Sequence, residues 1–238
     1  MSLVFVAATR MTRDAFLSSS LLARSLNTLS MMSSVKLCLF EQNSRPLGEC
    51  YNQAIDEADP QDTLVFAHDD VHLDDWMLPI RLEQALASFD VVGVAGNRRR
   101  QHGQETWYLL PSRCVAGQRQ MLTFDSQYLS GAILHGQPGQ AKVSNYGPTP
   151  ATVQLLDGVF MAMRAGRLQG ARVRFDPSLG FHFYDLDFCR TAQAAGLRLG
   201  TWPIAITHAS EGGSIHSQAW ADSCERYLAK YGEQRVPC

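Results

Sequence analysis

Three short apolar runs, each closed by polar residues and separated by segments with helical spacing, constrain the fold of this chain more than any other feature. The runs cover residues 3–8, 35–40 and 63–67. Continuous apolar runs of this length are typical of strands buried on both faces. Thr12 can cap the first intervening helix, and Pro60 ends the second. The pattern predicts βαβ units and an α/β fold with one Rossmann-like mixed central sheet flanked by helices.

The second half of the chain continues this alternation after a long irregular stretch. Asp74 or Asp75 can cap a helix that precedes an apolar strand at 91–95. From residue 97 to about residue 150 the regular pattern is lost, which in a compact domain indicates a functional or mobile insertion, with room for strands of its own. Regular structure resumes with a strand at 159–163, a helix at 186–195 capped by Asp185, and a last strand at 199–206.

Composition places the chain among globular proteins and excludes several kinds of partner. Its 238 residues suit a single domain, 45% of them are apolar, and 18% are charged. A formal net charge of -2 provides no field that attracts nucleic acid or an anionic membrane. No run approaches the roughly 18 apolar residues of a membrane span. Six scattered cysteines without a CxxC pair indicate reduced thiols rather than a thiolate zinc site, so we expect a cytoplasmic protein.

The strongest local signal lies at the end of the third apolar run. There the strand delivers three consecutive candidate ligands, His68, Asp69 and Asp70. Carboxylates at a strand end can hold a divalent cation while leaving positions open for phosphate oxygens. A solvated turn, or a cap for the following helix, would use the same residues without a metal. The local sequence leaves both interpretations open.

Two further segments place candidate chemistry beside the ends of helices and strands. Asp185 stands where a loop becomes a helix, and Asp187 follows two residues later. A carboxylate in that place can accept a proton from a hydroxyl group as a general base, although simple capping would also explain it. His208 follows the last strand and precedes a glycine-rich turn. Its neutral imidazole can complete a metal site or serve the structure alone.

The order of these segments resembles the family 2-like GT-A glycosyltransferases, most closely the branch related to the streptomycin-biosynthesis protein StrF. The resemblance covers residues 3–97 and 153–216. It implies one GT-A domain over residues 1–238, with 97–150 an irregular insertion on the acceptor side. It also implies transfer of a sugar from a nucleotide-diphosphate donor to the hydroxyl of a glycan or small-molecule acceptor, with inversion and with Mn²⁺ or Mg²⁺ as cofactor.

The resemblance also implies roles for individual residues. His68-Asp69-Asp70 stands in the place of the family's DXD motif, so Asp70 is the expected metal carboxylate, and His68 replaces the usual first aspartate as a further ligand. In that family a Glu-Asp pair at a helix start supplies the catalytic base, and Tyr184-Asp185 stands in its place without the first acid, so Asp185 inherits the role of base. His208 matches a histidine that often ligates the metal. The residues expected around the nucleotide are Thr9, Arg10, Glu41, Asn43, Asn52 and Asp69. Those expected around the acceptor are Asp157, Gly158 and Trp107.

Other interpretations remain open at this point. Trp107 and Tyr108 can offer flat surfaces to a sugar ring, or Trp107 can be a core residue. The run 98–100 of three arginines reads as solvated surface charge. A non-catalytic module that binds a sugar nucleotide or glycan would explain His68 and the missing first acid before Asp185. A metal-dependent hydrolase could use the same histidines and aspartates. Turnover of a donor would distinguish a transferase from the binding module. Binding of a nucleotide would distinguish a transferase from the hydrolase.

Overall fold

The chain is described here by a computed structural model that covers residues 2–31, 33–111, 114–115, 118–119, 123–210 and 217–235. Among these residues it has two large sheets and one two-stranded sheet, formed by β7 (Cys114–Val115) and β8 (Gln118–Arg119). The glycine-rich turn expected after His208 falls on 211–216, outside the described residues.

The central sheet is mixed, as predicted. Its strands, in spatial order, are β11 (Ala151–Thr152), β14 (Leu199–Thr201), β5 (Val91–Gly93), β13 (Phe160–Arg164), β3 (Thr63–Ala67), β1 (Leu3–Ala8) and β2 (Val35–Phe40). Strand β1 pairs in parallel with both β2 and β3, whereas β13 runs antiparallel to β3 and β5. The three apolar runs form strands with the predicted bounds. Every residue of β3 is buried and β1 is mostly buried, as expected of strands covered on both faces, whereas β2 lies at the edge of the sheet and has no fully buried residue.

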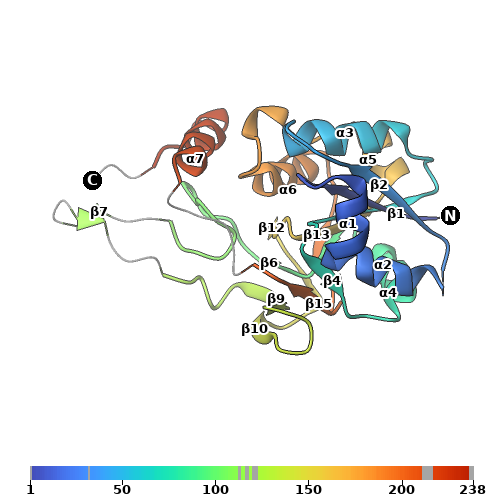
Figure 1. Cartoon of the computed structure of the whole chain (residues 1–238). Helices are drawn as coiled ribbons and strands as arrows, with labels where there is room; N and C mark the ends of the chain where they lie inside the picture. The colour runs from blue at the N-terminus through green and yellow to red at the C-terminus, as the bar shows by residue number, and fades with distance from the viewer. Residues whose placement is uncertain are drawn as a thin grey trace.

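Helices cover both faces of the central sheet. The helices of the described residues are α1 (Arg13–Ser19), α2 (Leu21–Ser30), α3 (Leu47–Glu57), α4 (Leu78–Ser88), α5 (Ala165–Ala171), α6 (Tyr184–Ala194), α7 (Gln218–Lys230) and the 3₁₀ helix η1 (Pro177–Leu179), and α7 packs on η1 rather than on this sheet. Figure 1 shows α3, α5 and α6 on one side of the sheet, and α1, α2 and α4 on the other. The α/β architecture predicted from the sequence is confirmed.

Two predicted helices differ in detail from the structure. The helix expected after Thr12 is divided at Ser20, whose hydroxyl accepts from the N–H of Ala23 over 3.0 Å and caps α2. Helix α4 begins beyond Asp74 and Asp75, and no described side chain caps it. Asp75 instead accepts from the N–H of the cap residue and pairs with Arg81. Thr12 caps α1 as predicted, with its hydroxyl accepting from the N–H of Ala15 over 3.3 Å. Only the cap predicted at Asp74 or Asp75 is wrong, because the contacts of Asp75 compete with capping.

The second sheet was not predicted. Its strands are β12 (Leu155–Leu156), β6 (Ala95–Asn97), β9 (Leu129–His135), β15 (Ile206–His208) and β4 (Val71–Leu73), with β10 (Lys142–Gly147) paired to β9. Among the described strands, the chain passes between the two large sheets seven times, at β3/β4, β4/β5, β5/β6, β10/β11, β11/β12, β12/β13 and β14/β15. The single strands predicted at 91–95 and 199–206 are therefore each two strands.

The arginine run at 98–100 is not mainly solvated, which corrects the prediction. Arg99 pairs with the buried carboxylate of Asp125, with 2.5 Å between Nη2 and Oδ1, and its guanidinium lies 3.7 Å from the ring centre of Tyr128. Arg100 pairs with the buried Glu233 over 2.9 Å. The buried carboxylates require these partners, because an unpaired buried charge is costly. Arg98 is exposed, as expected.

Two observations bear on the kind of protein. Within the described residues, no helix combines the length and the apolar character that crossing a membrane requires. Cys38, Cys50, Cys189 and Cys224, the cysteines whose side chains the structure describes, are free thiols. The cytoplasmic location stays a prediction.

Candidate active site

The carboxyl ends of β1, β2 and β3 meet at one edge of the central sheet, because these strands run parallel. The hydroxyl of Thr9 donates to Oδ2 of Asp69 over 2.5 Å, and the N–H of Asn43 donates to the carbonyl of Thr9 over 2.8 Å. Glu41 follows β2 at the same edge, and Arg10 is exposed beside Thr9. Five of the six residues expected around a nucleotide thus follow neighbouring strand ends.

Asn52 is engaged elsewhere. Its side-chain amide donates to the carbonyl of Phe175 and accepts from the N–H of the same residue, each over 2.9 Å. These two bonds tie α3 to the segment that precedes η1. The arrangement gives Asn52 a packing role that its sequence position did not indicate.

Three candidate metal ligands come together where β3 leaves the central sheet. One ligand atom each of His68, Asp70 and His208 lies within 4.8 Å of the others. The antiparallel pairing of β15 with β4 sets His208 opposite Val71 and so brings its ring beside Asp70, with 3.3 Å between Nε2 and Oδ1. Burial raises the pKa of Asp70, but hydrogen bonding and charge from His208 outweigh it and hold the pKa at about 2. The cluster offers two nitrogens and an ionised carboxylate.

Asp185 is not the cap of α6, which corrects the prediction. The helix begins at Tyr184, and the cap residue is Phe183, with φ 64°, a left-handed conformation that is unusual for an aromatic residue. Asp185 lies in the first turn, where Oδ1 accepts from the N–H of Leu186 over 2.9 Å and Oδ2 from the N–H of Gly158 over 3.0 Å. A tertiary contact, rather than capping, orients this carboxylate.

The pKa of Asp185 is raised from 3.8 to about 7. Burial is the main cause, the negative charge of Asp157 adds to it, and the backbone N–H groups oppose both. Asp187, the neighbouring carboxylate, is fully buried and bonded to Tyr231 over 2.7 Å and to Lys230 over 2.8 Å. Asp187 is therefore a packing residue, and Asp185 is the one that faces the cavity.

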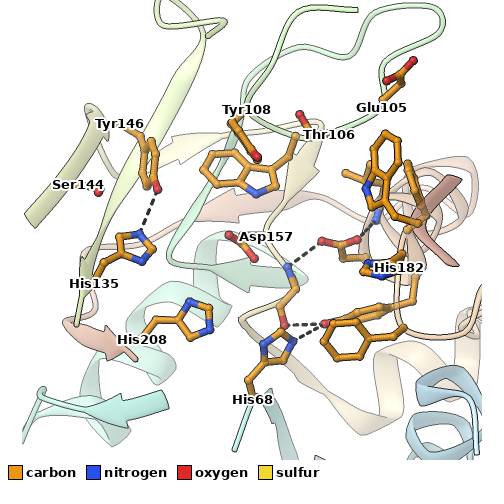
Figure 2. Close-up of a pocket in the computed structure, with 18 of the residues that line it drawn as sticks. His68, Glu105, Thr106, Tyr108, His135, Ser144, Tyr146, Asp157, His182 and His208 are labelled. Atoms are coloured by element: carbon orange, nitrogen blue, oxygen red, sulfur yellow. Dashed lines mark hydrogen bonds between the residues drawn. The ribbon is translucent and has the colours of Figure 1, made fainter. Parts of the chain in front are cut away.

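Hydrogen bonds join the candidate base to the candidate metal site (Figure 2). The hydroxyl of Tyr184 donates to the carbonyl of Gly158 over 3.0 Å and lies 2.9 Å from Nε2 of His68. The N–H of the same glycine binds Asp185. Asp157, one residue earlier, uses Oδ1 to accept from the N–H of Val159 over 2.9 Å. The turn between β12 and β13 thus connects both groups.

These residues open onto a cavity of about 530 Å³, a size common for small-molecule sites. Its aromatic lining comes from Trp107, Tyr108, Phe124, Tyr146, Phe181, Phe183, Tyr184 and Trp220. Trp107 is only 6% exposed and packs edge to face on Tyr108 and Tyr146, with ring centres 5.2 and 4.9 Å apart. Trp107 is therefore a core residue that also lines the cavity, and its contact with an acceptor stays a prediction.

Sequence reasoning missed several cavity residues. His135 and Lys142 come from the hairpin of β9 and β10, and pairing of β9 with β15 sets His135 opposite His208. Figure 2 shows His135 and His208 on the same side of the cavity. No local signal marks these two. Tyr184 carried a signal, because it stands where the resemblance expects an acid.

Comparisons with known proteins support the fold. No model of a known protein family matches the sequence, and no curated protein matches it. Among solved structures, S. aureus TarS matches with a TM-score of 0.52 and 12% identity, over 97% of this chain and 39% of that one. Mannosyltransferase PcManGT from Pyrobaculum calidifontis, in complex with GDP-Man and Mn²⁺, gives a TM-score of 0.50 and 12% identity, over 99% of this chain and 65% of that one. GalNAc-T7 with UDP, GalNAc and Mn²⁺ gives a TM-score of 0.50 and 10% identity, over 94% of this chain and 47% of that one.

The mixed central sheet flanked by helices matches the GT-A fold of these glycosyltransferases. The chain spans less than two thirds of the length of each of the three proteins. At these identities the likeness shows the fold alone. The relation to the StrF branch stays a prediction.

Proposed function

We propose that this protein is a metal-dependent glycosyltransferase that moves a sugar from a nucleotide diphosphate to an acceptor hydroxyl with inversion. The observation that carries the proposal is the position of Asp185, which shares a cavity with His68 and His208 and is joined to His68 through Gly158 and Tyr184. The GT-A fold supports it. Residues 1–238 act as one domain, with 97–150 forming the acceptor side.

On the donor side, Thr9, Arg10, Glu41, Asn43 and Asp69 would hold the nucleoside at the ends of β1, β2 and β3. Ligands of open α/β sheets bind at that edge. Among the matching structures, PcManGT is in complex with GDP-Man and GalNAc-T7 is with UDP. We therefore take UDP- and GDP-sugars as the candidate donors.

The residues present fit a divalent cation. His68, Asp70 and His208 would hold it, and two imidazoles with one carboxylate suit Mn²⁺ better than Mg²⁺, which prefers an all-oxygen shell. When bound, the cation offsets the charge that develops on the diphosphate. The residues of the chain hold and orient the donor around it.

The acceptor would lie against the aromatic lining of the cavity, with a hydroxyl at Asp185. Asp185 takes the proton of that hydroxyl while the hydroxyl oxygen bonds to the anomeric carbon, and the bond to the diphosphate breaks with its electron pair leaving on phosphate oxygen. A pKa of about 7 suits proton uptake near neutral pH. Asp157 and Gly158 line the same cavity and would contact the acceptor, with Asp157 binding a second hydroxyl.

A panel of UDP- and GDP-sugars, each with and without Mn²⁺, tests the proposal. The expected result is a donor that raises the melting temperature only with Mn²⁺, because a ligand of the folded state stabilises it. That donor should then release nucleotide diphosphate faster when glycan acceptors are added. Binding without turnover would indicate a binding module, and hydrolysis without nucleotide binding would indicate a hydrolase. The free thiols support a reducing compartment such as the cytoplasm as the place of this activity.

A further inference from the structure

The hydroxyl of Tyr184 lies between the side chain of His68 and the backbone of Gly158. It is 2.9 Å from Nε2 of His68 and 3.0 Å from the carbonyl oxygen of Gly158. A carbonyl oxygen can only accept, so the one hydrogen of the tyrosine hydroxyl points to Gly158. The tyrosine oxygen is then an acceptor toward His68. Nε2 of His68 must therefore carry the hydrogen of that bond.

This assignment fixes the role of the other ring nitrogen. A neutral imidazole with its hydrogen on Nε2 has its free lone pair on Nδ1. A metal ligand must present such a lone pair, and the partner of the other nitrogen sets which one does. In Figure 2 the bond from Tyr184 reaches the side of the His68 ring that is remote from His208. The remaining nitrogen is on the side of His208, one of the three residues of the candidate cluster.

We propose that Tyr184 is a positioning residue for the metal site, whose hydroxyl holds His68 in the Nε2–H form and leaves Nδ1 as the ligand atom for a divalent cation. The inference rests on the proposed function, which places a cation at His68, Asp70 and His208. It assigns a task to the residue that replaces the expected acid before Asp185. The same residue begins α6, so the orientation of His68 and the position of Asp185 depend on one element.

Tyr184 is rigid enough for this task. Only 3% of the residue is exposed, and its ring packs edge to face on Tyr51, with ring centres 5.8 Å apart. The Tyr184→Phe substitution keeps that ring and removes only the hydroxyl. Loss of a hydrogen-bond partner of a metal-bound histidine typically weakens metal affinity by about 10- to 100-fold.

The test is a titration of the donor-free protein with Mn²⁺, following unbound Mn²⁺ by electron paramagnetic resonance. Tyr184→Phe should bind Mn²⁺ at least about 10-fold more weakly than the wild type. Tyr227→Phe is the matched control, because Tyr227 is only 1% exposed, stacks on Phe183 and has its hydroxyl 3.4 Å from Arg190. The control should bind within about two-fold of the wild type.

A double-mutant cycle tests whether Tyr184 acts through His68. In a His68→Ala background, Tyr184→Phe should change Mn²⁺ affinity by less than about two-fold. Nitrogen–proton correlation spectra of the metal-free wild type should show the His68 hydrogen on Nε2. A hydrogen on Nδ1, equal affinity of Tyr184→Phe and wild type, or an undiminished effect in the His68→Ala background would each overturn the inference. A wild type that binds no Mn²⁺ would instead overturn the metal dependence of the proposed function.

Discussion

The peptide N–H of Gly158 donates a hydrogen bond to Oδ2 of Asp185 over 3.0 Å, which joins the turn between the two sheets to the first turn of α6. A Cβ atom on Gly158 would lie 2.3 Å from the hydroxyl oxygen of Tyr184 and 2.9 Å from Cβ of Asp185. The contact therefore exists because residue 158 has no side chain.

We expect Gly158→Ala to disrupt this contact. The added methyl group must displace the start of α6, and overpacking of a buried position typically costs about 1–3 kcal/mol. Transfer activity should fall as well, because Asp185 and Tyr184 both move. Chemical denaturation and a nucleotide-release assay measure the two effects.

Gly170→Ala is the matched control for that variant. Gly170 lies in α5. Apart from its two chain neighbours and the nearby backbone of its own helix, no described heavy atom would lie within 4 Å of the added Cβ. Alanine in a helix is favoured over glycine by up to about 1 kcal/mol, so the control should be as stable as the wild type or more so, with full activity. Equal stability of the two variants would contradict the assigned role of Gly158.

Asp185→Asn separates catalysis from packing. Asparagine offers one acceptor oxygen where the two carboxylate oxygens receive N–H groups from Gly158 and Leu186. We expect a loss of about 1 kcal/mol, which lowers Tm by about 2–4 °C in a chain of this length. Transfer should fall by about two orders of magnitude or more, since the amide cannot accept the proton. If the variant transfers sugar at a near wild-type rate and Asp157→Asn does not, Asp157 is the base.

The raised pKa of Asp185 predicts two opposite trends with pH. The folded state has a pKa of about 7 against an ordinary 3.8, so between about pH 4 and pH 7 it holds a proton that the unfolded state has released. The free energy of unfolding contributed by this group therefore falls as pH rises through that window. The active carboxylate forms over the upper part of it, so kcat/KM should rise through about pH 7.

Denaturation of the wild type and Asp185→Asn at several pH values checks the first trend. The stability advantage of the wild type should shrink from pH 5 to pH 8, because only the wild type loses the proton at residue 185. A constant difference across that range would show that the carboxyl group titrates near its ordinary pKa. The rate profile checks the second trend.

The strands at one edge of the fold were predictable because their signal is local. Strands β1, β2 and β3 have the predicted bounds. For β1 and β3 the reason is that strands covered on both faces have continuous apolar sequences. The edge strand β2 has the same kind of run without a fully buried residue. The passage from β5 to β6 was not predictable. Both strands are buried, so the apolar run carries no mark at Val94 where the chain changes sheets.

The candidate site was predictable only where a residue follows a recognisable strand or helix. His68, Asp70 and His208 were found that way, and the structure brings them together. His135 was missed because pairing between β9 and β15, strands far apart in the sequence, places it. The orientation of Asp185 was missed for the same reason, because its partner Gly158 lies on another element.

Removing the metal carboxylate should abolish metal-linked nucleotide binding. Asp70→Ala leaves His68 and His208 without the ionised partner that lies 3.3 Å from Nε2 of His208. Calorimetry with UDP or GDP should show binding by the wild type that requires Mn²⁺ and is lost in the variant. Binding of equal strength without metal would contradict the proposed site.

The last prediction concerns Glu233, which ties the chain after α7 to the segment that follows β6. Its buried carboxylate accepts from Arg100 and Arg190 over 2.9 Å each and from the N–H of Gly103 over 2.8 Å. A second ion pair joins the same two segments: Arg235, two residues after Glu233, pairs with Glu105, two residues after Gly103, over 3.0 Å. Glu105 and Trp107 line the cavity, so these ion pairs support one of its walls.

We therefore expect Glu233→Gln to weaken both the fold and the acceptor side of the site. Removing one partner of a buried ion pair typically costs about 3–5 kcal/mol, because the remaining charges stay buried without compensation. Glu225→Gln, an exposed change on α7, should cost less than about 0.5 kcal/mol. The Mn²⁺ affinity of folded Glu233→Gln should match the wild type, since the metal ligands lie on β15 and between β3 and β4, whereas KM for the acceptor should rise. An unchanged acceptor KM together with weakened Mn²⁺ binding would show that this ion-pair cluster supports the metal side of the cavity instead.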